Sequence, residues 1–511
     1  MLPKKYHKRR IKYSNDWSQL PNVVLDHVFS YLSWSDKVKA SSTCKRWRTG
    51  LYHPRYWETV SFPLSELNDK NKEKARYFIQ AFGKIVKYAN IYFNSTDFKS
   101  YSVTDELLYA LRDNMRLKKL MLIPTHCALF PINGPCNSSA TLNASWLYYH
   151  ILSILRNTDK FEELSIGCLN DVAMYSNKLL KIIADYHSKS IRALGFATLK
   201  CDPDEHILDS LNYGYIQNFT NLQVLSVNYD YVDDQFLQIL CNCMSLKRIV
   251  IHIHSNIKIH PGTSEEAWRQ LTKYCPKLEL RLNVIHAYYA VLDLHTSILK
   301  KSMPLTHLRV FFCEKLNSEA LNSLHMYQNS LKSLWWVDAP IYSSDCNVLL
   351  KLNDPSNGVR MNPFIFVAWR CTNLEELVLF GYNYFADDLC AISRLRGPVL
   401  KQVSVLRSEM HESTDEWSYH QTSSKEIQEE MSRRMGRPWK PLKKCELHPV
   451  FFSPEKYDSA EYLLPILCKD IEGNANEVHF SLYHGCFESR NINYTLGFEK
   501  VTHYRAGCSH R

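Results

Sequence analysis

Four residues in the middle of the chain are of types suited to metal binding. Cys241 and Cys243 are followed by His252 and His254, and thiolate and imidazole groups are the usual ligands of zinc. The Cys-x-Cys spacing is a poor match to zinc sites, and the two histidines occupy alternating positions of a strand-like segment. The sequence contains no C-x-x-C pair. We therefore expect no metal ion.

The motifs of common enzyme classes are also missing. The sequence has no G-x-S-x-G, H-E-x-x-H, P-loop or dinucleotide-binding motif. Only 15 of 511 residues are Gly, which argues against Gly-rich loops that cradle phosphates. We expect no catalytic residues and no cofactor, and an enzyme is the least favoured of the functional classes considered below.

The net charge of +10 is unevenly distributed along the chain. Residues 1–16 hold six of the 62 Lys and Arg residues and one of the 52 acidic residues, so this tail carries half of the excess. The remainder is nearly balanced for its size, which argues against a nucleic-acid-binding body. The tail is either a nuclear localisation signal or a solvated basic end.

The compartment is expected to be the cytoplasm, the nucleus or both. No apolar run reaches the ~18 residues that cross a bilayer, so no membrane partner is expected, and no apolar core follows the basic N-terminus as in a secretory signal. The 16 Cys residues form no dense local clusters. Reduced thiols are therefore the better interpretation than a disulfide framework.

Two short helices must position the first apolar surface. Leu20, Val24, Val28 and Leu32 recur every four residues, which predicts an amphipathic helix with Pro21 in its first turn. A second helix is expected to begin near residues 35–36. A bundle of about 45 residues cannot bury so broad an apolar face internally, so part of the first helix must meet a partner or the rest of the chain.

The segment 17–62 resembles an F-box. The family pattern is filled in order by Leu20-Pro21, Val24-Leu25, Val28-Phe29, Leu32, Asp36, Cys44, Arg46-Trp47 and Trp57. The resemblance implies binding of Skp1, and through it a cullin and a RING subunit. The Skp1-binding residues that it implies are Leu20, Pro21, Leu25, Phe29 and Leu32. For Val24, Val38, Cys44 and Trp47 we favour a role in the core of the small domain.

The body of the chain repeats a strand-like phrase, L-x-x-L-x-L. Clear copies begin at residues 117, 161, 191, 222, 246, 305, 331, 374 and 400, and a copy near 278 is one residue short. The spacing of most copies is within or near the range of leucine-rich repeats. Asp105, Asp234, Glu319 and Asp388 each lie 12 residues before the opening Leu of the next copy. These acidic residues predict helix starts, so the unit is strand, turn, helix, turn.

The resemblance is therefore to F-box proteins with irregular, cysteine-containing leucine-rich repeats. Cys243, Cys275, Cys313 and Cys371 are expected to be small buried hydrophobes. The predicted fold class is α/β: a small helical F-box and a solenoid with parallel strands on its concave face and helices on its convex face. The expected division is a disordered basic tail (1–16), the F-box (17–62), the solenoid (63–410) with loop insertions near 124–145 and 339–363, a polar insertion (411–444) and a C-terminal repeat or cap (445–511).

The concave face is the expected substrate-binding surface. Strand side chains alternate, so positions three, five and seven of each copy face the concave side. Large aromatic residues and Arg are the types most often found in binding hot spots. The candidate substrate-binding residues are Arg248, Arg309, Phe311, Trp335, Phe380 and Tyr382. An equally weighted alternative is that the insertions or the terminal segment fold over this face and bury the aromatic residues.

The leading hypothesis is a non-catalytic substrate adaptor of a Skp1–cullin–F-box ubiquitin ligase, which binds a protein substrate and promotes its ubiquitination and degradation. It acts by holding the substrate near the ligase. The alternative is a leucine-rich-repeat scaffold without ligase function. The sequence leaves the identity of the substrate open.

Overall fold

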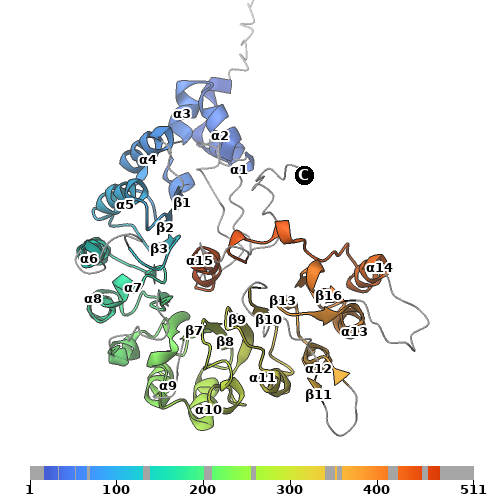
Figure 1. The fold of residues 1–511 in the computed structure, drawn as a ribbon. Coiled ribbons are helices and arrows are strands. Elements are labelled where there is room, and N and C mark those ends of the chain that lie inside the picture. The colour runs from blue at the N-terminus through green and yellow to red at the C-terminus, as the bar shows by residue number, and fades with distance from the viewer. Residues whose placement is uncertain are drawn as a thin grey trace, which may run out of the picture.

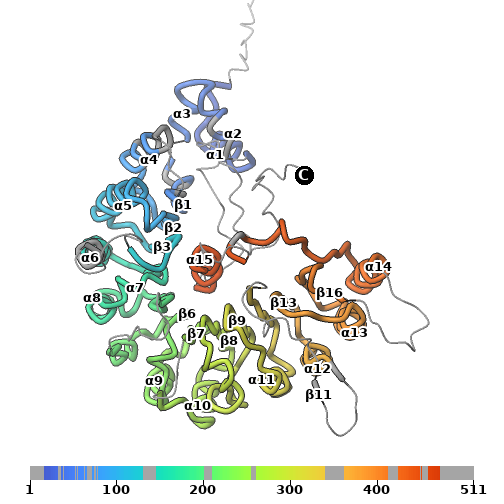
Figure 2. Tube along the Cα trace, viewed as in Figure 1, coloured from blue at the N-terminus to red at the C-terminus, as the bar shows by residue number. Residues whose placement is uncertain are grey.

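The computed structural model describes residues 17–32, 34–51, 53–65, 69–129, 139–200, 210–254, 260–339, 352–353, 360–411, 424–451 and 459–471. The expected tail (1–16), residues 130–138 of the first expected loop insertion and most of the second lie outside these residues. Helices line the outer side of an arc and strands its inner side, as the solenoid interpretation predicts (Figure 1). Figure 2 shows the chain following this arc from the helical N-terminal domain at one end to α14 at the other.

The N-terminal domain is built from short helices packed around each other. They are the 3-10 helix η1 (Trp17–Gln19), α1 (Asn22–Tyr31), α2 (Trp34–Ser41), α3 (Lys45–Leu51) and the 3-10 helix η2 (Pro54–Trp57). Trp57 joins this domain to the solenoid, because its ring stacks on Phe82 with 3.4 Å between centroids. Its indole N–H donates to the carbonyl of Leu51 at 2.7 Å.

One parallel sheet of 12 strands runs through the solenoid, and its strands follow each other in chain order. Such an order requires each repeat to pair only with its neighbours, which is the topology of a solenoid. The strands are β1 (Thr59–Leu64), β2 (Tyr88–Phe93), β3 (Lys119–Pro124), β4 (Glu163–Ser165), β5 (Ala193–Gly195), β6 (Val224–Asn228), β7 (Arg248–His254), β8 (Glu279–Ile285), β9 (Leu305–Phe311), β10 (Ser333–Val337), β13 (Glu376–Phe380) and β15 (Gln402–Val405).

Two repeats precede the first copy recognised in the sequence. Strand β1 pairs in register with β2, and β2 pairs in register with β3, but β1 and β2 carry Val, Phe, Ala and Ile at the inward positions where β3 has the repeated Leu. The solenoid therefore begins at Thr59, inside the range expected for the F-box. Any apolar residue fills an inward position of a strand, so a search for Leu alone misses these copies.

The convex helices bury their apolar faces against the sheet. They are α4 (Asp69–Phe82), α5 (Phe98–Leu111), α6 (Ser139–Asn157), α7 (Asn170–Ala173), α8 (Ser176–His187), α9 (Asp234–Leu240), α10 (Glu265–Tyr274), α11 (Ser318–Ser323), α12 (Pro363–Arg370), α13 (Ala386–Arg396) and α14 (Ser424–Met435). Asp234, Glu319 and Asp388 lie in the first turns of α9, α11 and α13, as predicted.

The expected helix start at Asp105 is wrong. Asp105 lies in the middle of α5, and the N-cap is Asp97, whose carboxylate accepts from the backbone N–H of Ser100 at 2.8 Å. Part of the expected loop near 124–145 is also helical, since α6 begins at Ser139. In the second expected loop the described residues form a short antiparallel pair, β11 (Leu352–Asn353) with β12 (Arg360–Met361).

The segment expected to be a polar, solvated insertion supplies a helix of the convex layer. Helix α14 packs beside α13 (Figure 1) and buries Ile427, Met431 and Met435. Its outward positions are charged, which makes the sequence look uniformly polar. A small parallel pair, β14 (Tyr384–Phe385) with β16 (Met410–His411), lies nearby.

The last described segment leaves the arc and enters its interior. The 3-10 helix η10 (Pro449–Phe451) and helix α15 (Ala460–Lys469) lie on the concave side of the sheet (Figure 1). Of the range expected to form a C-terminal repeat or cap, the described part adds no strand to the 12-stranded sheet. Residues 472–511 lie outside the described residues.

Candidate functional site

The first candidate site is the surface of α1, and the structure divides its apolar residues into an inner and an outer set. Leu25 and Phe29 are buried between the helices of the small domain. A Cβ atom on Gly50 would lie 2.7 Å from Leu25 Cδ2, so α3 approaches Leu25 closely. The ring of Phe29 meets Trp47 edge-on, with 5.8 Å between centroids. Leu25 and Phe29 therefore hold the domain together, and the Skp1-binding role expected for these two residues stays a prediction.

The outer set includes residues that the sequence analysis assigned to the core or passed over. Val24 is exposed instead of buried, and Val23 and Tyr31 beside it are 80% and 77% exposed. Pro21 is exposed, and Leu20 and Leu32 are half-buried. Since 100° separates successive residues, a helix that buries Leu25 and Phe29 must turn Val23 and Val24 outward. The open apolar surface is thus Leu20, Pro21, Val23, Val24, Tyr31 and Leu32.

The second candidate site is the concave face, and it is covered by the chain itself. Phe311, Trp335 and Phe380 do face the concave side, as the strand alternation predicted, but all three are fully buried against η10 and α15. Arg309 is 4% exposed. Of the two alternatives left open by the sequence, the terminal segment folding over this face is the one observed. These side chains are therefore not exposed in this structure, and their expected role in substrate binding stays a prediction.

Tyr382 and Arg248 depart from the prediction in other ways. Tyr382 belongs to the solenoid core, where its hydroxyl donates to a carboxylate oxygen of buried Asp338. It follows the strand and the left-handed Gly381 (φ +88°), so the strand alternation no longer applies to it. Arg248 is half-buried, and its guanidinium donates to the backbone carbonyl of Asp470 at 3.1 Å.

Asp470, just after α15, is the centre of the polar contacts on the concave face. The Nη1 atom of Arg309 lies 2.9 Å and 2.8 Å from the two carboxylate oxygens. Arg281 also pairs with this carboxylate, and the Asn283 amide donates to it at 3.1 Å. Ion pairs this deeply buried are stabilising only when hydrogen bonds satisfy the carboxylate, and here at least three donors do so.

The three guanidinium groups set the protonation of their neighbours. Burial alone raises the pKa of Asp470, but attraction to Arg309 and Arg281 outweighs it and holds that pKa below the usual range. Burial, together with repulsion from the same two arginines, lowers the pKa of His307 to about 2. The concave face therefore combines neutral imidazole with a paired carboxylate, which suits binding rather than proton transfer.

The sequence did not predict three residues of this site, namely Arg281, Asn283 and Asp470. The first two lie on β8, which pairs with β9 through a register irregularity between Leu280 and Arg281. This irregularity explains why the copy near 278 is one residue short, and the corrected register aligns Arg281 with His307 and Asn283 with Arg309. No repeat pattern could have placed Asp470 beside them, because it lies outside the repeats.

The candidate metal ligands are separated in the structure. Cys243 is buried in the solenoid core, where burial raises the pKa of its thiol to about 12. The rings of His252 and His254 instead contact the carbonyl of Thr198 on the concave side. Within the described ranges, no three His, Cys, Asp or Glu side chains are grouped to hold a metal ion, and no helix is long and apolar enough to cross a membrane.

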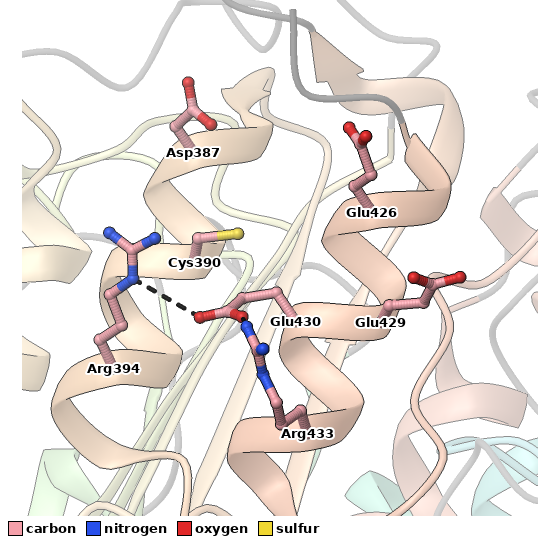
Figure 3. A pocket seen from close by; sticks show the side chains of 7 residues that line it. All are labelled: Asp387, Cys390, Arg394, Glu426, Glu429, Glu430 and Arg433. Atoms are coloured by element: carbon pink, nitrogen blue, oxygen red, sulfur yellow. Dashed lines mark ion pairs between the residues drawn. The ribbon is translucent and has the colours of Figure 1, made fainter. Parts of the chain in front are cut away.

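A cavity of about 590 Å³ lies on the convex side between α13 and α14 (Figure 3). It is lined by both acidic and basic side chains, and Glu430 pairs with Arg394 at 3.6 Å and with Arg433. Cys390 also lines it, but burial raises the pKa of this thiol. The ion pair between Arg394 and Glu430 joins α13 to α14 across this cavity.

The fold and the small helical domain define a class: a helical F-box-like domain followed by a leucine-rich-repeat solenoid. Residues 17–63 match the F-box-like family model. The chain is homologous to human F-box only protein 33, with 20% identity over 494 residues that span 86% of each chain. It is also homologous to bovine F-box/LRR-repeat protein 21, with 24% identity over 83% of this chain and 89% of that protein. The mouse form of F-box only protein 33 is likewise 20% identical, over 86% of this chain and 85% of its own.

Proposed function

We propose that the protein is the substrate-recognition subunit of a Skp1–cullin–F-box ubiquitin ligase. The observation that carries this proposal is the F-box-like match over residues 17–63, whose first helix presents an apolar surface that nothing in the described chain covers. Apolar surface of this kind on a small domain is typical of a protein-binding site. Skp1 is the proposed partner, and it connects the chain to a cullin and a RING subunit.

The proposed mechanism is proximity. The F-box fixes one end of the arc on the ligase, and the solenoid holds a protein substrate within reach of the ubiquitin-loaded enzyme. The chain supplies effective concentration and orientation, and the other subunits supply the chemistry. We propose that it works in the cytoplasm, the nucleus or both.

Co-purification of the full chain with Skp1 and a cullin tests the proposal. Wild type should capture both, and Leu20→Asp with Pro21→Ala should reduce capture at least tenfold, because a charge then enters the apolar surface. Met244→Asp is the matched control, since Met244 is an exposed apolar residue on the solenoid. Failure of the wild-type chain to capture Skp1 would favour the alternative, a repeat scaffold without ligase function.

A further inference from the structure

Helix α15 is held in the arc by side-chain packing and takes no part in the strand ladder. The 12 strands pair with one another, and none pairs with residues 459–471. The helix also contains Pro465, which removes one backbone hydrogen bond. A segment joined to the solenoid in this way can leave without breaking a repeat, because the repeats are stabilised by their neighbours.

The apolar side of α15 fits a surface built from aromatic and β-branched side chains. Leu463, Leu464 and Leu467 are fully buried in the same cluster as Trp335 and Phe380. At the far end Ile471 packs beside Gly195, where a Cβ atom would lie 2.5 Å from Ile471 Cδ1. The concave face thus accepts an apolar helix along its length.

The polar end of this surface carries more positive charge than α15 neutralises. Arg248, Arg281 and Arg309 all contact Asp470, which brings a single carboxylate. The nearby Glu279 pairs with Lys332 at 2.7 Å and also attracts Arg248 and Arg281, so the cationic groups still outnumber the carboxylates. The Nε atoms of Arg281 and Arg309 are buried without a hydrogen-bond partner. Buried donors of this kind are costly, so the site has capacity for an anion with more acceptors than Asp470 offers.

We propose that the concave face is the recognition surface for a helix of a partner protein, and that α15 is an internal copy of that ligand. The helix would carry leucines four residues apart and an anionic side chain three residues after the second, matching Leu463, Leu467 and Asp470. The anion is a carboxylate or a phosphate. This inference rests on the proposed adaptor function, because it identifies the class of substrate that the solenoid takes.

Displacement of α15 then controls the affinity for the partner. A helix in the same chain competes at a high effective concentration. The apparent affinity for the partner is therefore the intrinsic affinity multiplied by the fraction of molecules in which the face is open. A substitution that loosens α15 from the concave face must therefore strengthen binding of the partner helix. A substitution that removes one of the arginine charges must weaken binding of the partner helix.

A fluorescent peptide with the sequence of residues 459–471 is the probe, and its anisotropy with the full chain is the measurement. Asp470→Asn in the chain should bind the probe at least tenfold more tightly than wild type does. Asp387→Asn is the matched control, because Asp387 is an exposed carboxylate on the convex helix α13. Adding Arg309→Gln to the Asp470→Asn chain should lose at least tenfold in affinity.

The anion is identified by changing the probe. A probe with Asn in place of Asp470 should bind at least tenfold more weakly, and one with phosphoserine there is compared with the Asp probe. Tighter binding of the phosphoserine probe assigns a phosphate, and tighter binding of the Asp probe assigns a carboxylate. Equal affinity of the Asn and Asp probes, or no gain from Asp470→Asn in a chain that melts like wild type, would overturn the proposal.

Hydrogen–deuterium exchange on the wild-type chain gives an independent answer if Asp470→Asn unfolds. Amides of 460–469 should exchange at least a hundredfold faster than those of β8, through local opening. Equal rates would make α15 a fixed part of the core and overturn the inference. Skp1 capture by the same preparations reports the proposed adaptor function separately, because α1 and the concave face share no residues.

Discussion

Arg309 and Asp470 are 161 residues apart in the chain, yet the guanidinium of one lies 2.8 Å from the carboxylate of the other inside the arc. Arg309 is also stacked over the ring of Trp335, 5.0 Å from its centroid. The same arginine thus joins the polar and the apolar halves of the concave face to the C-terminal segment.

Trp335→Ala and Phe380→Ala should each lower the free energy of unfolding by roughly 3–5 kcal/mol, the usual effect of emptying a large aromatic site. Both side chains are fully buried, so the loss reflects a cavity rather than a missing contact with substrate. Urea denaturation of the full chain measures the effect. Trp369→Ala is the control and should cost less than about 1 kcal/mol, because Trp369 is 54% exposed. Wild-type stability of Trp335→Ala would contradict the covered face.

Phe29→Ala and Val24→Asp should fail in different ways. Phe29 packs between Trp47 and Tyr56, so its loss should unfold the small domain, at a cost of roughly 3–5 kcal/mol. Val24 faces outward, so Val24→Asp should keep the melting curve of wild type and reduce Skp1 capture at least tenfold. Circular dichroism and capture assays on both variants distinguish the two effects. A Val24→Asp chain that captures Skp1 normally would remove this residue from the proposed docking surface.

Stability should fall as the pH rises from 6.5 to 8.5. Burial raises the pKa of Asp338 to about 7 and that of Glu409 to about 8. The folded chain therefore retains protons that the unfolded chain has already released above about pH 4. Its free energy of unfolding falls as the pH rises toward these values, by up to about 1.4 kcal/mol per pH unit for each group, and levels off above them. Denaturation at the two pH values measures this change.

Glu409→Gln should flatten that pH dependence. The amide oxygen of Gln can still accept from the backbone N–H of Gly381, which donates to Glu409 at 2.8 Å. Glu429→Gln is the matched control, since Glu429 is an exposed carboxylate on α14. An unchanged pH dependence in Glu409→Gln would show that Glu409 is not the group responsible.

Gly381→Ala should lower the free energy of unfolding by more than 1 kcal/mol. The backbone of Gly381 is left-handed, with φ +88°, and an added Cβ would lie 2.7 Å from the carbonyl oxygen of Asp338. Neither problem is solved by a rotamer change, because both involve backbone atoms. Gly436→Ala is an informative comparison: its φ is +68°, but no atom lies within 4 Å of the added Cβ, so it should cost less. Equal effects would argue against the close approach.

Most of the repeat architecture was predictable from the sequence, because each repeat is stabilised by local, periodic patterns. Leu at alternating strand positions and acidic first turns predicted strands such as β9 and helices such as α11. The pattern failed at β1 and β2, where other apolar residues fill the inward positions. It also failed at β8, which is one residue short relative to β9, so that the register shifts between Leu280 and Arg281. The apolar face of α1 was recognised, but with apolar residues on several adjacent positions the pattern could not tell Leu25 from Val24.

The sequence by itself determined the F-box-like segment, the leucine-rich repeats and the side of each strand on which Arg309, Phe311 and Trp335 lie. Only the tertiary structure decided that this side is occupied. The periodicity of a strand records which side chains share a face, but it carries no information about a segment far along the chain. Asp470 reaches Arg309 because the arc brings the strands into a concave surface that fits α15, and that shape exists only after the repeats have stacked.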